Sequence, residues 1–152
     1  MFDKILVAVG GDDESFEPVR AASRLACQLG AELSFLSVAP PTGDTLGEPL
    51  YSELLEERLG RTETVLDQAR QVAEGEGATV ASVDELEGSP AERIVNFARQ
   101  GGFGLIVVGT RQRGRLQSAL LGSVSASVAA RSEVPVMVVP ERHLASPERQ
   151  PE

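Results

Sequence analysis

Five short strand-like segments, separated by stretches with helical spacing, constrain the fold of this 152-residue chain more than any other feature. Most of them are continuous apolar runs, which is typical of strands buried on both faces of a sheet. Strands that alternate with helices favour parallel βαβ units with right-handed crossovers. The pattern therefore predicts an α/β, Rossmann-like fold, in which helices cover both faces of an open five-stranded parallel sheet.

The expected strands are bounded by glycine, proline and acidic residues. The third is partly polar, which indicates a position near a sheet edge, and proline is acceptable at the start of the fifth. In chain order the strands are Lys4–Val9, Glu32–Val38, Thr79–Leu86, Phe103–Gly109 and Pro135–Val139.

The first expected helix follows the acidic segment GGDDES, where Asp12 or Asp13 can cap its start. Gly30 is a suitable residue to end it. Cys27 lies within the helical pattern and is expected to be a small buried hydrophobe. The apolar residues with helical spacing are Phe16, Val19, Ala22, Ala26 and Leu29.

The second helix is expected to be the longest, over residues 50–74, with its apolar residues mostly on one face. The third begins at GSPAE, where Ser89 is the expected N-cap, Pro90 the first helical residue and Glu92 the partner in a capping box. The fourth covers Ser123–Arg131. The apolar face of the second helix comprises Leu54, Leu55, Leu59, Leu66, Ala69, Val72 and Ala73.

Charge and cysteine content exclude several classes of function. A net charge of −9 argues against general affinity for nucleic acids or anionic membranes. The single cysteine rules out an internal disulfide and fits a reducing compartment. The amino terminus lacks the pattern of a signal peptide, and no apolar run is long enough to span a bilayer. We therefore expect a cytoplasmic protein with one domain over residues 1–140 and a disordered polar tail over residues 141–152.

The segment VVGTRQRGRLQSALLGS, residues 107–123, is the strongest candidate for a binding site. It follows a buried parallel strand, and open sheets of this kind bind ligands beyond the carboxyl ends of their strands. Gly122 permits close approach, Ser123 can donate or cap, and the next helix presents its amino-terminal amides. Arg111, Arg113 and Arg115 can add charge-assisted contacts to an anion. In the alternative interpretation, Ser123 only caps the helix and the arginines are solvated.

Other kinds of site are poorly supported by the sequence. One cysteine and one histidine cannot supply the usual zinc ligands. A Ser-His-Asp triad would need His143 of the tail to fold back onto the domain. Asp12, Asp13 and Glu14 could hold a magnesium ion on a nucleotide, although helix capping explains them better. The chain contains no Walker A motif.

Three segments of the chain together resemble the universal stress protein family. KILVAV with its acidic loop is similar to the family's opening, GSPAERIVNFA…GLIVVGTR to its middle, and GTRQRGRLQSALLGSVSASVAARSEVPVMVV to its end. The resemblance covers Met1 to about Pro140. It implies strand order 3-2-1-4-5 and a homodimer that pairs through the last strand, Val134–Val139. Many members bind ATP or AMP, whereas others bind no nucleotide.

The resemblance also implies a set of ligand-binding positions, at which this chain departs in part from the family. Gly109 matches the first glycine of the nucleotide signature and Gly122–Ser123 its last pair, but Gln112 replaces the middle glycine. Gly10 stands where an aspartate usually contacts the nucleoside, and Gly104 where an aspartate commonly precedes the fourth strand. The candidate nucleotide-binding residues are Val9, Gly10, Val38, Gly109, Arg111, Gln112, Gly122, Ser123 and Val124.

Three functions remain open at this level. The first is a regulatory stress protein, not an enzyme beyond weak ATP hydrolysis, that binds ATP (with magnesium) or AMP weakly or conditionally. The second is the same fold without nucleotide, acting as a dimeric protein-interaction module. The third is an adenylating enzyme, because GGDD at residues 10–13 resembles part of the ATP-pyrophosphatase loop, although both serines of that loop are replaced.

Overall fold

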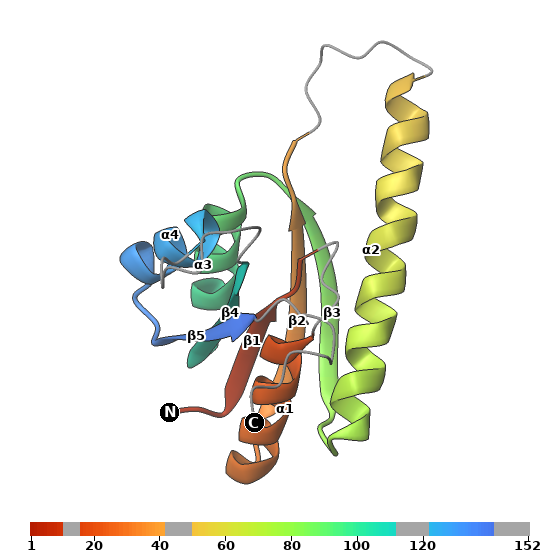
Figure 1. Ribbon diagram of the computed structural model, residues 1–152. Coiled ribbons are helices and arrows are strands. Elements are labelled where there is room, and N and C mark those ends of the chain that lie inside the picture. The colour runs from red at the N-terminus through yellow and green to blue at the C-terminus, as the bar shows by residue number, and fades with distance from the viewer. Residues whose placement is uncertain (11–15, 42–49, 112–121, 142–152) are drawn as a thin grey trace, which may run out of the picture.

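The computed structural model describes residues 1–10, 16–41, 50–111 and 122–141 (Figure 1). Strands and helices alternate along these residues as the sequence predicts. The elements are β1 (Lys4–Ala8), α1 (Glu17–Leu29), β2 (Glu32–Ala39), α2 (Leu50–Gly75), β3 (Val80–Glu87), α3 (Pro90–Gln100), β4 (Leu105–Arg111), α4 (Ser123–Arg131) and β5 (Val136–Glu141).

The five strands form one parallel sheet in the order β3-β2-β1-β4-β5. This confirms the predicted fold class and strand order. The partly polar strand β3 lies at one edge of the sheet, as its composition indicates, and β5 lies at the other. The chain reverses direction across the sheet at β1, whose two neighbours are β2 and β4, so the topological switch point lies between β1 and β4.

Two apolar cores flank the sheet, because successive strand residues point to opposite faces. On one face, Ile5 and Val7 of β1 pack in the cluster beneath α1 and α2. On the other face, Leu6 and Ile106 pack in the cluster beneath α3 and α4. Figure 1 shows the two helix pairs on opposite sides of the sheet.

The start of α1 differs from the prediction. The N-cap position is Phe16, which adopts a left-handed conformation with φ of 54° and makes no side-chain capping bond. Pro18 in the first turn suits a helix start, because its fixed φ is already helical. Asp12 and Asp13, the predicted caps, lie outside the described residues. Gly30 ends the helix in the left-handed conformation, as predicted.

Two residues at the end of α1 are more exposed than predicted. Leu29 is 49 % exposed, and Cys27 is exposed as well. Ala26 of the same turn is buried in the core, so the covered face of α1 is narrower here than the apolar pattern suggests. The Cys27 thiol donates to the carbonyl of Glu76 at 3.5 Å, beside the end of α2. Cys27 is therefore not the buried hydrophobe that we expected.

The predicted N-cap of α3 is confirmed only in position, whereas α4 has a different N-cap from the one considered. Ser89 is the N-cap of α3 and Pro90 follows it, but the Ser89 side chain makes no capping bond and Glu92 is exposed, so no capping box forms. In α4 the N-cap is Gly122, and Ser123 is the first helical residue. The alternative in which Ser123 caps this helix is therefore wrong.

The long helix α2 is buried along only part of its length. Leu66, Ala69 and Ala73 are buried against the sheet, whereas Leu59 is 46 % exposed. Figure 1 shows the amino-terminal end of α2 reaching beyond the sheet, which explains the exposure of Leu59. The side chains of Leu54 and Leu55 lie outside the described residues. No helix among the described residues is long and apolar enough to cross a membrane.

The last strand extends further than predicted. β5 pairs with β4 from Val136 to Glu141, so Glu141 belongs to the sheet and not to the tail. The Glu141 amide donates to the Thr110 hydroxyl at 3.3 Å, and the residue is 8 % exposed. Residues 142–152 lie outside the described part of the chain, so the disordered tail stays a prediction.

Candidate functional site

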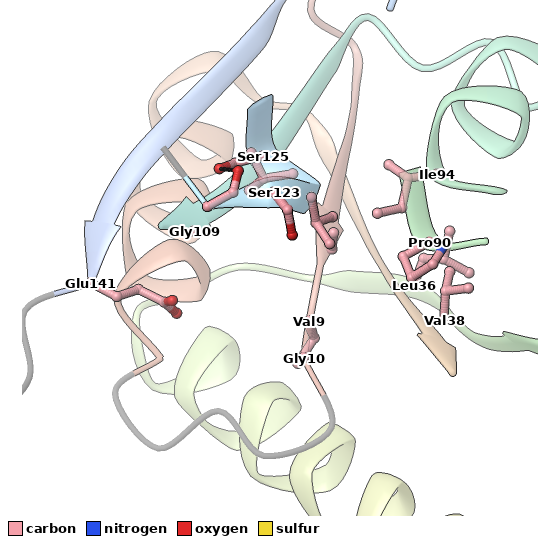
Figure 2. A pocket seen from close by; sticks show the side chains of 14 residues that line it. Val9, Gly10, Leu36, Val38, Pro90, Ile94, Gly109, Ser123, Ser125 and Glu141 are labelled. Carbon is pink, nitrogen blue, oxygen red and sulfur yellow. Dashed lines mark hydrogen bonds between the residues drawn. The ribbon is translucent and has the colours of Figure 1, made fainter. Parts of the chain in front are cut away.

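A pocket of about 460 Å³ opens at the carboxyl ends of β1, β2 and β4. This is the edge at which open parallel sheets bind ligands, at the point where the strand order reverses. The amino-terminal turns of α3 and α4 complete its wall. The pocket has two chemically different ends, which Figure 2 shows on opposite sides of Val9 and Gly10.

One end of the pocket is apolar. Leu36 and Val38 from β2 face Pro90 and Ile94 from the start of α3 (Figure 2). Leu36 and Ile94 are anchored in the core beneath α3 and α4, and Val38 packs against that core. This end therefore presents a fixed apolar surface, of the kind that lines most small-molecule sites.

The other end is formed by the start of α4. The amide of Ala126 is the first to bond within the helix, donating to the Gly122 carbonyl at 2.9 Å. The amides of Ser123, Val124 and Ser125 precede it and belong to the group of donors that a helix cannot satisfy internally. The Ser125 hydroxyl is buried and donates back to the Gly122 carbonyl at 3.0 Å. Unpaired amides and the positive end of the helix dipole favour an anion at this place.

Glu141 reaches the same end of the pocket from β5. A Cβ atom built on Gly109 would lie 2.5 Å from Cδ of Glu141 and 2.8 Å from each carboxylate oxygen. The Glu141 carboxylate therefore fills the space that a side chain at position 109 would need. Any residue larger than glycine at position 109 would require Glu141 to move.

The structure brings most of the predicted site residues together. Those that line the pocket are Val9, Gly10, Val38, Gly109, Gly122, Ser123 and Val124. Arg111 is the last residue of β4, but its side chain lies outside the described residues, as do Gln112, Arg113 and Arg115. Whether these four side chains contribute to the site stays a prediction.

Several lining residues were missed by sequence reasoning. Pro90 and Ile94 were assigned to helix start and core, and Glu141 was assigned to the tail. The rule that places ligands near helix starts at the carboxyl edge could have found Pro90, because α3 begins at that edge. No local pattern could have found Glu141, since its position depends on the pairing of β5 with β4. Among the described residues there is no group of three or more potential metal ligands.

Together, the fold and the pocket define an open parallel α/β domain with a pocket at its topological switch point. The chain belongs to the universal stress protein family, since residues 1–140 match the model of that family. A relative from Thermus aquaticus, named "Universal stress protein in QAH/OAS sulfhydrylase 3'region", is 37 % identical over 139 residues. That alignment covers 91 % of this chain and 99 % of the relative.

Solved structures agree with this assignment. The universal stress protein UspA from Lactobacillus plantarum matches with a TM-score of 0.78 at 23 % identity, covering 91 % of this chain and 97 % of that one, and thus supports the fold. A universal stress protein solved in complex with cAMP matches with a TM-score of 0.65 at 28 % identity. This match covers 90 % of the present chain and 95 % of the other.

Proposed function

We propose that this protein is a regulatory member of its family that binds an adenine nucleotide, AMP or ATP, weakly or conditionally. The observation that carries the proposal is one pocket with an apolar end at Val38 and an anion-binding end at the start of α4. A nucleotide has the matching division, with an apolar base at one end and phosphate at the other. The related protein that was solved with cAMP supports the same ligand class.

The apolar end is suited to the base. Val38 and Pro90 offer half-buried apolar side chains, which the fully buried Leu36 supports from beneath. Burial of a flat aromatic base between such groups removes apolar surface from water, which contributes roughly 25 cal/mol per Å². Val9 and Gly10 lie between the two ends (Figure 2), and this position supports a contact with the sugar.

The phosphate end is suited to an anion in spite of the acidic net charge. The amides at the start of α4 supply a local positive potential that requires no lysine or arginine. The exposed Ser123 hydroxyl adds a donor at the first turn. Gly122 at the N-cap leaves the backbone open on this side.

Two departures from the family pattern explain why we propose weak binding. Gly10 lines the pocket but has no carboxylate to accept from ribose hydroxyls, and one such hydrogen bond contributes about 0.5–1.5 kcal/mol. Gln112 adds a side chain where the family has a glycine. Since about 1.4 kcal/mol corresponds to tenfold in affinity, these changes weaken a micromolar ligand considerably.

Calorimetry with AMP and with magnesium and ATP tests the proposal, together with mass spectrometry of nucleotide released from the purified protein. We expect saturable binding that Ser123→Glu abolishes, because the new carboxylate opposes phosphate at the first turn of α4. Ala129→Glu, at an exposed position of the same helix, adds the same charge and should leave binding intact. No heat of binding at millimolar nucleotide would overturn the proposal.

A second candidate function is a dimeric protein-interaction module that binds no nucleotide. Gly10, which brings no carboxylate to the pocket, favours it. Replacing Gln112 by glycine restores the family signature and should then create ATP binding that the natural chain lacks. Low-micromolar binding by the unaltered protein would exclude this second function.

We further propose that the protein is a cytoplasmic homodimer that pairs through Val134–Val139 and has no catalytic role beyond weak ATP hydrolysis. In support of the dimer, β5 lies at the edge of the sheet and its residues Val136–Val139 are only half-buried. Unpaired edges of this kind invite pairing with another chain. The single cysteine supports the reducing compartment, and magnesium would enter only as part of the ATP complex.

A further inference from the structure

The strand end at Glu141 places a carboxylate inside the proposed nucleotide pocket. Glu141 lines the pocket at the end opposite Val38, and Figure 2 shows its side chain pointing from the end of β5 toward Gly109 and Gly10. Only 8 % of the residue is exposed. Pairing of β5 with β4 and the bond from its amide to Thr110 fix its backbone.

The position of the Glu141 carboxylate requires a residue without a side chain at position 109. The carboxylate lies where a side chain at position 109 would be, with both oxygens 2.8 Å from the position of such a Cβ atom. The open side of this glycine, which would otherwise admit a ligand, is thus occupied by the chain itself. A ligand group that approaches Gly109 from this side must displace the carboxylate or lie beside it.

A phosphate group and a carboxylate compete for the same hydrogen-bond donors and positive charges. Both are anions that favour amide donors and cationic side chains, and like charges at short range repel, most strongly where water is partly excluded. The effect on a ligand depends on how many phosphates it carries. With its base at the Val38 end, a monophosphate brings one phosphate to the end that the start of α4 shares with Glu141, whereas a longer phosphate chain crowds more negative charge into that same end.

We propose that Glu141 makes this pocket selective for adenine ligands with few phosphates, so that AMP is preferred to ATP. The inference rests on the proposed function, because it assigns a specificity to the same site. Glu141 acts by charge and by occupying the space beside Gly109. It does not contact the base, since the apolar end is formed by residues of β2 and α3.

The first test measures the unaltered protein by calorimetry with adenosine, AMP, ADP and ATP, in the absence of magnesium. We expect the affinity to fall by about tenfold or more from AMP to ATP. This series needs no variant and is decisive if variants fail to fold. ATP binding as tight as AMP binding would overturn the inference while leaving the proposed function standing.

The second test is Glu141→Gln, which removes the charge and keeps the shape. We expect the affinity for ATP to rise by about tenfold and the affinity for AMP to change by less than about threefold. Glu133→Gln is the matched control, because it lies just before the opposite end of β5, is exposed, and makes the same change in net charge. Six strand residues separate the two ends by about 20 Å.

The outcomes separate the two proposals. An equal gain for AMP and ATP in Glu141→Gln, or a gain of the same size in Glu133→Gln, would overturn the selectivity and keep nucleotide binding. Absence of binding by every nucleotide, in the unaltered chain and in both variants, would overturn the proposed function and the selectivity with it. Thermal unfolding of each variant checks that the fold is intact.

Discussion

At the scale of single residues, two glycines of this chain make room for different neighbours. Gly109 leaves room for the Glu141 carboxylate, whereas Gly104 leaves room for the backbone of the first residues. A Cβ atom on Gly104 would overlap the carbonyl oxygen of Met1, and the Gly104 amide donates to the Lys4 carbonyl at 2.9 Å. The crossing of the amino-terminal segment leaves no room for a side chain at position 104.

Substitution of Gly104 by alanine should therefore destabilise the protein. The added methyl group forces the Met1–Phe2 backbone to shift, and overpacking of this kind costs about 1–3 kcal/mol. Denaturant unfolding measures the change in the free energy of unfolding.

Gly60→Ala is the control for this prediction. Gly60 lies within α2 with open space around it, so alanine there should stabilise the helix by about 0.5–1 kcal/mol. If Gly104→Ala were as stable as the unaltered protein, the close passage of the amino-terminal segment would be wrong.

At the scale of elements, α2 carries apolar residues along one face, but among its described side chains only those in its carboxyl-terminal half are buried. Leu66 is 4 % exposed and packs with Ala69 and Ala73 against the sheet, whereas Leu59 is 46 % exposed. The end of the helix that contains Leu59 reaches beyond the sheet (Figure 1). The energetic contribution of α2 therefore comes mainly from its carboxyl-terminal half.

Alanine substitution at these two leucines should separate the halves of α2. Leu66→Ala leaves a cavity beneath the helix and should lower the free energy of unfolding by about 2–5 kcal/mol. Leu59→Ala makes the same chemical change at an exposed position and should cost no more than about 0.5 kcal/mol. Equal losses, measured by urea unfolding, would contradict the partial burial of α2.

At the scale of the whole molecule, the two edges of the sheet differ in how they are covered. β3 carries only half-buried and exposed residues and lies beside α2. β5 carries four successive half-buried apolar residues, Val136–Val139, at the other edge. This difference is the reason why we propose the β5 edge, and not the β3 edge, for pairing with a further copy of the chain.

Sedimentation velocity tests the dimer that we propose on this basis. We expect a species of twice the 16.1 kDa chain mass at micromolar concentration, because pairing along β5 would cover this apolar edge. A monomer at every concentration would show that the edge stays open in solution.

The sequence predicted the fold more fully than the site. Apolar runs such as Ile5–Val7 and helical spacing are local consequences of burial on two faces, so the parallel sheet and its helix layers followed from general rules, whereas the strand order came from the resemblance to the family. The predicted capping box failed because a Ser-x-x-Glu pattern is local, whereas Pro90 can start α3 without any side-chain bond from Ser89 or Glu92. Asp12 and Asp13 lie outside the described residues. Cys27 failed because helical spacing does not report where the covering face ends.

What the sequence determined by itself is the order of elements, the carboxyl edge as the place for a ligand, and the glycines and serine at the start of α4. The tertiary structure alone decided what lies opposite those residues. Glu141 is far from Gly109 in the chain, and only the pairing of β5 with β4 brings its carboxylate into the pocket. Local patterns record which residues are buried, whereas the charge inside a pocket depends on which strand ends meet there.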